Sequence, residues 1–230
     1  MKLSVIILNY NVRHFLELCL CSVEKATKGL DTEIIVADNN SSDDSCAMVR
    51  VEFPGVKLIE NKENLGFAKG NNAAVEQAQG EYICILNPDM VVPENLFREM
   101  LDFASDHSKM GAVGCKLIDG SGQFLPESKL NVPTVKVALG KLTGSSKGYY
   151  ADHIEVDHDA PVDILVGAIM FIRKAVYEEV GGFDEAYFMY GEDIDLSYTL
   201  LKKGYQNWYL GRLKCIHYKG ESSVRNKVYL

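Results

Sequence analysis

Short apolar runs alternate with stretches of helical periodicity along the first half of the chain. Four of these runs predict strands, because continuous apolar residues suit a strand that is covered on both faces. They are residues 3–8, 33–37, 56–59 and 81–86. Helical spacing of apolar residues predicts helices at 15–23, 42–52, 67–79 and, starting at Pro93, up to 104. This order predicts an α/β fold with a mostly parallel, Rossmann-like sheet flanked by helices.

The second half of the chain has a less regular pattern. The expected elements are strands at 113–117 and 162–173, a helix at 192–203, and two short strands at 205–210 and 213–217. An Asp-Gly-Ser-Gly turn is expected at 119–122. Residues 125–161 carry Pro, Gly, Ser, Lys and Tyr without periodicity, and we expect a long irregular segment there. Long ordered loops are usually functional.

Polar clusters follow the predicted strands of the first half, at the point where each strand ends. They are Asn9-Tyr10-Asn11, residues 38–42, residues 61–66 and Asn87-Pro88-Asp89. The carboxyl ends of parallel strands meet at one edge of a sheet, and ligands of such folds bind at that edge. The pattern therefore predicts a polar ligand site formed by all four clusters.

Composition narrows the function classes. A length of 230 residues suits one domain, and the net charge of −8 argues against nucleic acid as a partner. A metal ion and a few cations could still hold a small anionic ligand. Six cysteines lack CxxC spacing, so most are expected to be small buried residues. The first apolar run is too short for a signal peptide, and a cytoplasmic location is expected.

Several residues could carry chemistry, and each also has a structural interpretation. Asp89 follows a buried strand and could hold a divalent metal, although Asn-Pro-Asp also favours a turn. Glu192 and Asp193 could act as acid or base, although carboxylates also stabilise the first turn of a helix. His217 at the end of a strand could ligate a metal or be a structural histidine.

Other residues are compatible with a nucleotide site. Asp38 could accept hydrogen bonds from a base or ribose, and the turn before Phe67 could place a helix N-terminus near an anion. The first strand opens into Asn9-Tyr10-Asn11 without a GxGxxG pattern, so a dinucleotide-dependent oxidoreductase is disfavoured. Aromatic residues could stack on sugar rings or fill half-buried surface. They are Trp208 and tyrosines 149, 150, 187 and 190.

Six motifs in the chain resemble those of glycosyltransferase family 2, which has the GT-A fold, and most closely its rhamnosyltransferase-like branch. They are residues 5–11, 36–43, 64–72, 86–89, 181–196 and 216–222. The resemblance covers nearly the whole chain except about residues 125–161. It implies one GT-A domain over residues 1–230, with a nucleotide-sugar-binding half (1–118) and a smaller acceptor-side half that holds the catalytic base (119–230).

The resemblance implies that the first half binds the nucleotide-sugar. Asp38 would contact the pyrimidine base, and uracil and thymine present the same N3–H, so UDP and dTDP donors both suit it. The other residues of this half that the resemblance assigns to the nucleotide-sugar are Asn9, Asn11, Asn40, Asn64, Gly66, Asn71, Asn87 and Asp89.

The remaining implied roles concern the metal and the reaction. Asn87-Pro88-Asp89 occupies the place of the family's DxD motif, so Asp89 is similar to its metal ligand and His217 to a histidine that completes the site. Asn87 replaces the first acid and removes one negative charge from the expected Mg²⁺ or Mn²⁺ site. Asp193 is similar to the catalytic base, with Glu192 placed to hold donor or acceptor hydroxyls.

The resemblance therefore implies an inverting glycosyltransferase of the hexosyltransferase type. It would move a sugar, rhamnose by analogy with the branch, from a UDP- or dTDP-sugar to a saccharide or lipid-linked saccharide in bacterial cell-surface polysaccharide synthesis. Peripheral association with the inner face of the membrane is compatible with such an acceptor. Two alternatives are a non-catalytic nucleotide-sugar-binding relative and a sugar-phosphate nucleotidyltransferase. The intact Glu192-Asp193 pair argues against the first, and the absence of a Gly- and Arg-rich phosphate loop after the first strand argues against the second.

Overall fold

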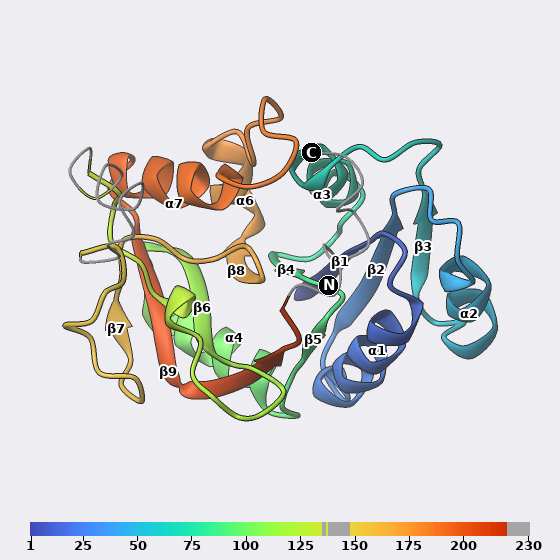
Figure 1. Cartoon of the computed structure of the whole chain (residues 1–230), viewed down its shortest axis with the longest axis horizontal. Coiled ribbons are helices and arrows are strands. Elements are labelled where there is room, and N and C mark those ends of the chain that lie inside the picture. The colour runs from blue at the N-terminus through green and yellow to red at the C-terminus, as the bar shows by residue number, and fades with distance from the viewer. Residues whose placement is uncertain (135–136, 138–147, 220–230) are drawn as a thin grey trace.

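The computed structural model of the chain describes residues 1–134, 137 and 148–219. Within these residues, one mixed sheet runs through the molecule with helices on both faces (Figure 1). Its strands are β1 (Leu3–Asn9), β2 (Thr32–Asp38), β3 (Lys57–Glu60), β4 (Tyr82–Leu86), β5 (Met90–Val91), β6 (Met110–Ile118), β7 (Ala160–Pro161), β8 (Ile169–Arg173) and β9 (Gln206–His217). The helices are α1 (Arg13–Thr27), α2 (Ser45–Glu52), α3 (Phe67–Glu76), α4 (Leu96–Asp106), η1 (Pro126–Ser128), α6 (Lys174–Glu179) and α7 (Glu192–Lys202).

The strand order is β3-β2-β1-β4-β8-β6-β9-β5, with β7 paired to β9. The first four strands are parallel, so the loops that follow them lie at one edge of the sheet. β8 enters antiparallel between β4 and β6, β9 runs parallel to β6, and β5 pairs antiparallel with the end of β9. The predicted fold class, an α/β domain with a mostly parallel sheet flanked by helices, is confirmed. The polar ends of β1, β2 and β4 meet at the same edge, as the alternation predicts.

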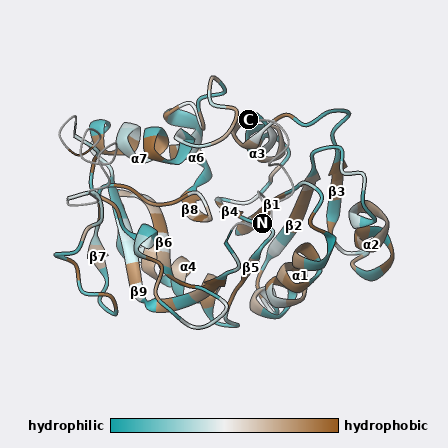
Figure 2. Cartoon of the chain, in the orientation of Figure 1, coloured by the Kyte–Doolittle hydropathy of each residue, from teal (hydrophilic) through white to brown (hydrophobic). Residues whose placement is uncertain are grey.

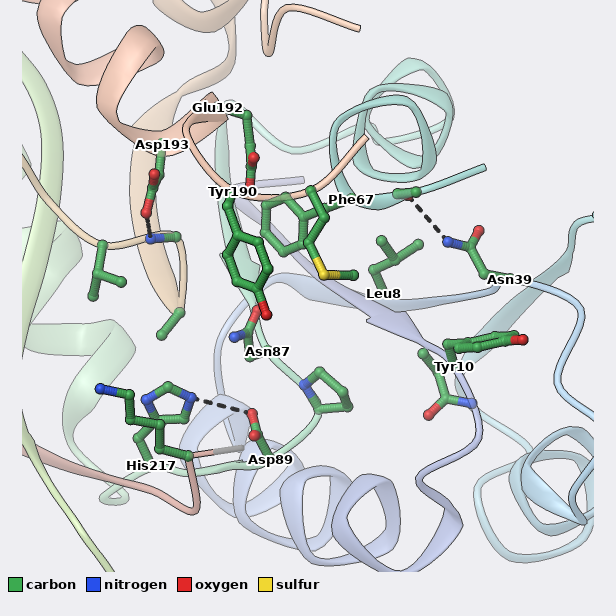
Figure 3. A pocket seen from close by; sticks show the side chains of 18 of the residues that line it. Leu8, Tyr10, Asn39, Phe67, Asn87, Asp89, Tyr190, Glu192, Asp193 and His217 are labelled. Atoms are coloured by element: carbon green, nitrogen blue, oxygen red, sulfur yellow. Dashed lines mark hydrogen bonds and ion pairs between the residues drawn. The ribbon is translucent and has the colours of Figure 1, made fainter. Parts of the chain in front are cut away.

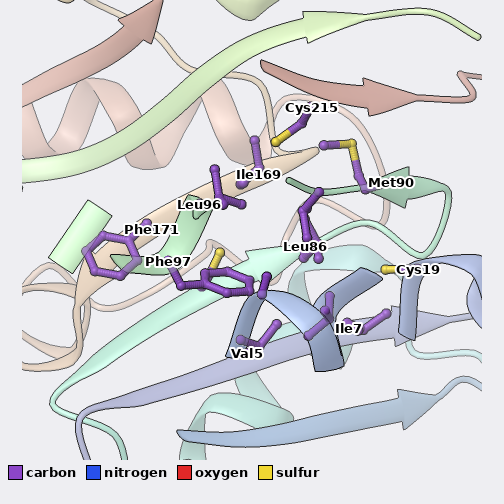
Figure 4. Close-up of a cluster of buried hydrophobic side chains, with 14 of the residues drawn as sticks. Val5, Ile7, Cys19, Leu86, Met90, Leu96, Phe97, Ile169, Phe171 and Cys215 are labelled. Atoms are coloured by element: carbon purple, nitrogen blue, oxygen red, sulfur yellow. The ribbon is translucent and has the colours of Figure 1, made fainter. Parts of the chain in front are cut away.

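Two apolar layers hold the helices against the sheet. Val5 and Ile7 of β1 face the layer below α1 and α4, whereas Ile6 faces the layer below α3 and α7. Figure 4 shows the first layer, where Phe97 of α4 packs beside Val5 and Phe171. Each such side chain contributes roughly 1.5–3 kcal/mol when fully buried. Hydrophobic colour is concentrated on the strands and polar colour on the connecting loops (Figure 2).

Four buried cysteines belong to this core, and no cysteine in the described residues forms a disulfide, which confirms their prediction as small apolar residues. No helix of the described part of the chain has both the length and the apolar character that crossing a bilayer requires.

Two strand predictions for the second half differ from the structure. The apolar run 162–173 is a strand only from Ile169 onward. Before that residue, the backbone of Val162 bonds to Asn207 and that of Ile164 bonds to Leu130, so these residues do not pair with a single neighbouring strand. The two final strands are one strand, β9, with a register irregularity opposite Cys115 and Lys116 of β6.

Helix positions also differ. The helix expected to begin at Pro93 begins later, because Pro93 lies in a turn that accepts a hydrogen bond from the N–H of Leu96, the first residue of α4. The short helix α6 was not predicted, because its six residues give too little periodicity to recognise. Of the irregular segment 125–161, the structure describes residues 125–134, 137 and 148–161, which include η1 and β7, and residues 135–136 and 138–147 lie outside the described residues.

Candidate active site

A cavity of about 360 Å³ opens at the carboxyl edge of the parallel strands (Figure 3). Its volume is typical of small-molecule sites. Its walls come from the ends of β1, β4 and β9, the N-termini of α3 and α7, and the segment before β8. The predicted site residues that line it are Asn9, Asn64, Gly66, Asn87, Asp89, Glu192, Asp193 and His217.

Asn9, the last residue of β1, is fully buried and is held by the end of β2. Its Nδ2 donates to Asp38 Oδ1 at 2.7 Å and to Ser41 Oγ at 3.2 Å. Asp38 Oδ2 in turn accepts the Ser41 backbone N–H at 2.7 Å. Asp38 is thus buried and holds the Asn9 side chain through a hydrogen bond, but it does not line the cavity. Its contact with a base stays a prediction.

Asn39 forms the next part of this wall. Its Nδ2 donates to Asn64 Oδ1 and to the Gly66 carbonyl oxygen, both at 3.1 Å. Gly66 has φ +78° and ψ −175°, a region that is essentially restricted to glycine, and a Cβ there would lie 2.4 Å from the Phe188 carbonyl oxygen. The sequence motif pointed to Asn40 in place of Asn39. Asn39 is identified as a site residue because it is buried between two polar clusters and lines the cavity.

Besides Asp38, three further predicted residues do not line the cavity. Asn11, with φ +56°, accepts the Ser42 N–H through Oδ1 at 2.7 Å and borders a separate hollow beside α1. Asn40, with φ +62°, is exposed. Asn71 is buried within α3 and donates to the Phe67 carbonyl oxygen at 2.9 Å. Their roles in ligand binding stay predictions.

Asp89 and His217 meet at the floor of the cavity. The pairing of β5 with β9 places Met90 opposite His217, and His217 Nε2 lies 3.4 Å from Asp89 Oδ1. Their side chains are 1% and 9% exposed. Among the described residues, Asp89 Oδ1 and His217 Nδ1 are buried without a hydrogen-bond partner. Asn87 lies beside them, with its backbone N–H bonded to the Ala168 carbonyl oxygen at 2.9 Å.

These two side chains fit a divalent cation that also binds the ligand. A buried carboxylate oxygen without a hydrogen bond is costly unless a cation or proton meets it. The described residues hold no cluster of three or more His, Cys, Asp or Glu side chains. Protein would therefore supply two ligands, Asp89 and His217. Ligand oxygens and water would have to complete the octahedral shell that Mg²⁺ requires.

Asp193 and Glu192 begin α7 on the opposite side of the cavity. Asp193 Oδ2 accepts the Gly167 N–H at 2.9 Å, and Oδ1 accepts the Ile194 N–H at 2.8 Å, which fixes the carboxylate (Figure 3). Burial raises the pKa of Asp193, and these backbone hydrogen bonds oppose the rise. Burial also raises the pKa of Glu192 from 4.5 to about 7, with a smaller contribution from the charge of Asp193. A raised pKa makes each carboxylate a stronger base than one in water.

Replacing Glu192 by glutamine is expected to make the chain more stable at pH 8 and to change little at pH 5. The folded state holds the Glu192 proton more tightly than the unfolded state, so this residue lowers stability as pH rises from 4.5 to about 7. The neutral amide removes that loss. Thermal unfolding midpoints of both proteins between pH 5 and 8 measure the effect.

The control for this experiment is Glu63→Gln, which changes an exposed glutamate outside the cavity. Its midpoint should follow that of the wild type across the range. A Glu192→Gln midpoint that runs parallel to the wild-type midpoint at every pH would contradict the expected coupling.

Lys219 belongs to the motif at residues 216–222, whereas Glu127 and the segment from Val166 to Ala168 belong to none of the six motifs and were not predicted to line the site. Glu127 of η1 and Lys219, just after β9, form an ion pair of 2.5 Å at the cavity wall. The segment from Val166 to Ala168 lines the cavity and carries the N–H that holds Asp193. Ninety-two positions separate Glu127 from Lys219, so the chain pattern carried no signal for their pairing.

The fold and the cavity define an α/β protein that binds its ligand at the carboxyl edge of the parallel strands. The sequence profile of glycosyl transferase family 2 matches residues 4–181, and the chain belongs to this family of glycosyltransferases. It is 28% identical over 242 residues to the N-acetylglucosaminyl-diphospho-decaprenol L-rhamnosyltransferase of Mycobacterium tuberculosis, covering 97% of this chain and 78% of that protein. It is 26% identical over 202 residues to the rhamnosyltransferase WbbL of Escherichia coli K12, covering 81% of this chain and 72% of that protein.

Solved structures support the GT-A fold. GalNAc-T7 with UDP, GalNAc and Mn²⁺ superposes with a TM-score of 0.72 at 16% identity, over 94% of this chain. The mannosyltransferase PcManGT of Pyrobaculum calidifontis, in complex with GDP-Man and Mn²⁺, gives 0.70 at 20% identity, over 98% of this chain. The chain spans 44% and 59% of these two proteins.

Proposed function

We propose that the chain transfers a sugar from a nucleoside diphosphate donor to an acceptor hydroxyl, with inversion at the anomeric carbon. The observation that carries this proposal is the arrangement of one cavity. A buried polar wall (Asn9, Asn39) and a buried pair of a carboxylate and an imidazole (Asp89, His217) lie in the same space as the buried, oriented carboxylate of Asp193. The polar wall suits nucleotide binding, the Asp89 and His217 pair suits departure of a diphosphate, and Asp193 suits deprotonation of an acceptor.

In the proposed reaction, Asp193 takes the proton of the acceptor hydroxyl. As that oxygen bonds to the anomeric carbon, the bond from this carbon to the diphosphate oxygen breaks, and the diphosphate leaves with the electron pair. The two hydrogen bonds to Asp193 keep its carboxylate in one orientation, and its raised pKa makes it a stronger base. Attack from the side opposite the diphosphate inverts the configuration.

Residues at the other end of the cavity would stabilise the leaving diphosphate. Asp89 and His217 would hold Mg²⁺ or Mn²⁺, and the cation would supply positive charge next to the departing oxygens. Lys219 lines the same space and offers a further positive charge once its pairing with Glu127 is exchanged for the diphosphate. These charges act in a partly buried site, where they are stronger than in water.

The relatives guide the choice of substrates. Two of them are named as rhamnosyltransferases, and one name includes an N-acetylglucosaminyl-diphospho-decaprenol acceptor. We therefore propose a UDP- or dTDP-hexose as the donor, with dTDP-rhamnose first among candidates. We propose a lipid-linked saccharide as the acceptor, in bacterial cell-surface polysaccharide synthesis. Such an acceptor would bring the chain to the inner face of the membrane as a peripheral protein.

Thermal unfolding with UDP, dTDP, GDP or NAD, each with and without Mn²⁺, tests the proposal. A ligand at 100 times its dissociation constant stabilises a fold by about 2.7 kcal/mol. We expect stabilisation by UDP or dTDP that depends on Mn²⁺, and none by NAD. Equal response to NAD, or no response to any nucleoside diphosphate, would overturn the proposal. The nucleotide that stabilises most then selects the donors for an assay of sugar transfer.

A further inference from the structure

The segment before α7 exposes an unusual run of large side chains. Tyr187, Phe188, Met189 and Tyr190 are all exposed, and Tyr190 is 72% exposed. Met189 and Tyr190 also line the cavity. Tyr190 has φ +70°, a left-handed conformation that is rare for a bulky residue. It is followed by Gly191 at φ +103°, so the backbone makes two consecutive left-handed steps before the helix begins.

Backbone contacts on both sides hold this segment in place. The Phe67 N–H donates to the Phe188 carbonyl oxygen at 2.8 Å, and Gly66 lies so close to that oxygen that a Cβ would not fit. On the other side, the Gly191 carbonyl oxygen accepts the Asp195 N–H of α7 at 2.9 Å. Tyr190 lies between these two fixed points, so the fold holds the backbone from which its ring extends.

Figure 3 shows where the ring points. It lies over the cavity between the side of Asp193 and the side of Leu8, with its hydroxyl directed towards Asn87. Among the residues that the structure describes, the hydroxyl has no hydrogen-bond partner. Other aromatic residues considered from the sequence lie elsewhere. Trp208, for example, packs edge-on against Phe103 outside the cavity.

Folding by itself does not explain this arrangement. An exposed ring gains little hydrophobic stabilisation, and a left-handed tyrosine costs backbone strain. Strained residues are concentrated at active sites and ligand sites, where the surrounding structure holds them in place. A ring that is held over a cavity and left uncovered is suited to pack against the face of a ligand.

We propose that the Tyr190 ring binds the sugar ring of the nucleotide-sugar donor, and that this contact distinguishes the donor from the sugar-free nucleotide. This inference rests on the proposed function. The anomeric carbon has to lie between Asp193, which activates the acceptor, and Asp89, next to the diphosphate. The ring over that space is the ring of Tyr190. The face of C–H groups on a hexose packs on an aromatic ring, which adds affinity without a hydrogen bond to the hydroxyl.

Isothermal titration calorimetry on the full chain with Mn²⁺ tests the inference through matched ligand pairs. The pairs are dTDP with dTDP-L-rhamnose, UDP with UDP-glucose and GDP with GDP-mannose. Within the pair that the wild type binds, Tyr190→Ala is expected to weaken the nucleotide-sugar about tenfold and to leave the sugar-free nucleotide unchanged. Tyr190→Phe should bind both ligands as the wild type does. Tyr198→Ala removes an exposed tyrosine of α7 outside the cavity and is the matched control.

The other outcomes overturn either the inference alone or the proposed function together with it. Wild-type affinity for the nucleotide-sugar in Tyr190→Ala would overturn the inference alone. Equal weakening of both ligands of a pair would place the ring against the nucleotide and also overturn it, and so would a Tyr190→Phe protein that behaves like Tyr190→Ala. No binding of any pair by the wild type would overturn the proposed function, and the inference with it.

Discussion

Replacing Asp193 by asparagine is expected to reduce the rate of sugar transfer by about 10²- to 10⁴-fold, the usual contribution of a general base. The amide cannot take the proton of the acceptor hydroxyl. The fold should persist, since the asparagine side chain retains an oxygen that can accept one of the two backbone N–H groups that Asp193 now binds. Loss of the other hydrogen bond costs about 1 kcal/mol. The turnover number at saturating donor and acceptor measures the effect.

Asp195→Asn is the matched control for this experiment. Asp195 lies in the same helical turn and does not line the cavity, so its replacement should leave turnover near the wild-type value. Thermal stabilisation by the nucleoside diphosphate should be the same in all three proteins, because Asp193 is not expected to touch the nucleotide. Full turnover by a folded Asp193→Asn protein would remove the base from the proposed mechanism.

Replacing Asp89 by asparagine is expected to abolish the effect of Mn²⁺ on nucleotide binding. Altering even the outer partners of a metal ligand typically lowers metal affinity 10- to 100-fold, so loss of the carboxylate itself should reach at least about 100-fold. Asparagine fills the same space, and the buried Oδ1 of Asp89 has no hydrogen bond to lose among the described residues. Stability without metal should therefore stay near the wild-type value, while sugar transfer is lost.

Calorimetric titration of the nucleotide with and without Mn²⁺ measures this effect. Asp102→Asn, which changes an exposed carboxylate on α4, should retain the full dependence on Mn²⁺. His217→Gln provides an independent variant of the same pair and should weaken the dependence in the same direction. Undiminished dependence on Mn²⁺ in the Asp89→Asn protein would show that the cation binds elsewhere.

The sequence was most informative where chain periodicity and sheet geometry agree. Parallel strands necessarily end at one edge, so the polar residues after β1, β2 and β4 could be placed together from the sequence alone. The same reasoning could not separate Asn39 from Asn40. β2 ends at Asp38, and the chain turns through a left-handed conformation at Asn40, so strand alternation no longer determines which side chain is buried.

The sequence could not predict contacts between residues that lie far apart along the chain. The apolar run 162–173 indicated burial correctly, yet burial does not specify a hydrogen-bond ladder, and residues 162–168 use irregular backbone pairing. That irregular segment supplies Gly167, which orients Asp193. Glu127 and Lys219 belong to no periodic element, and their contact depends on how β9 returns beside β6.

The pairing of β5 with β9 has a consequence for how the protein is made. Ribosomes release a chain from its N-terminus, and early segments fold before later ones emerge. The polar wall around Asn9 needs only the first strands and can form early. Asp89 meets its partner only after His217 has been synthesised and β9 has docked. A nascent chain therefore forms this polar wall before it can hold the proposed cation, and any reaction with donor would have to wait until β9 has been synthesised and has docked.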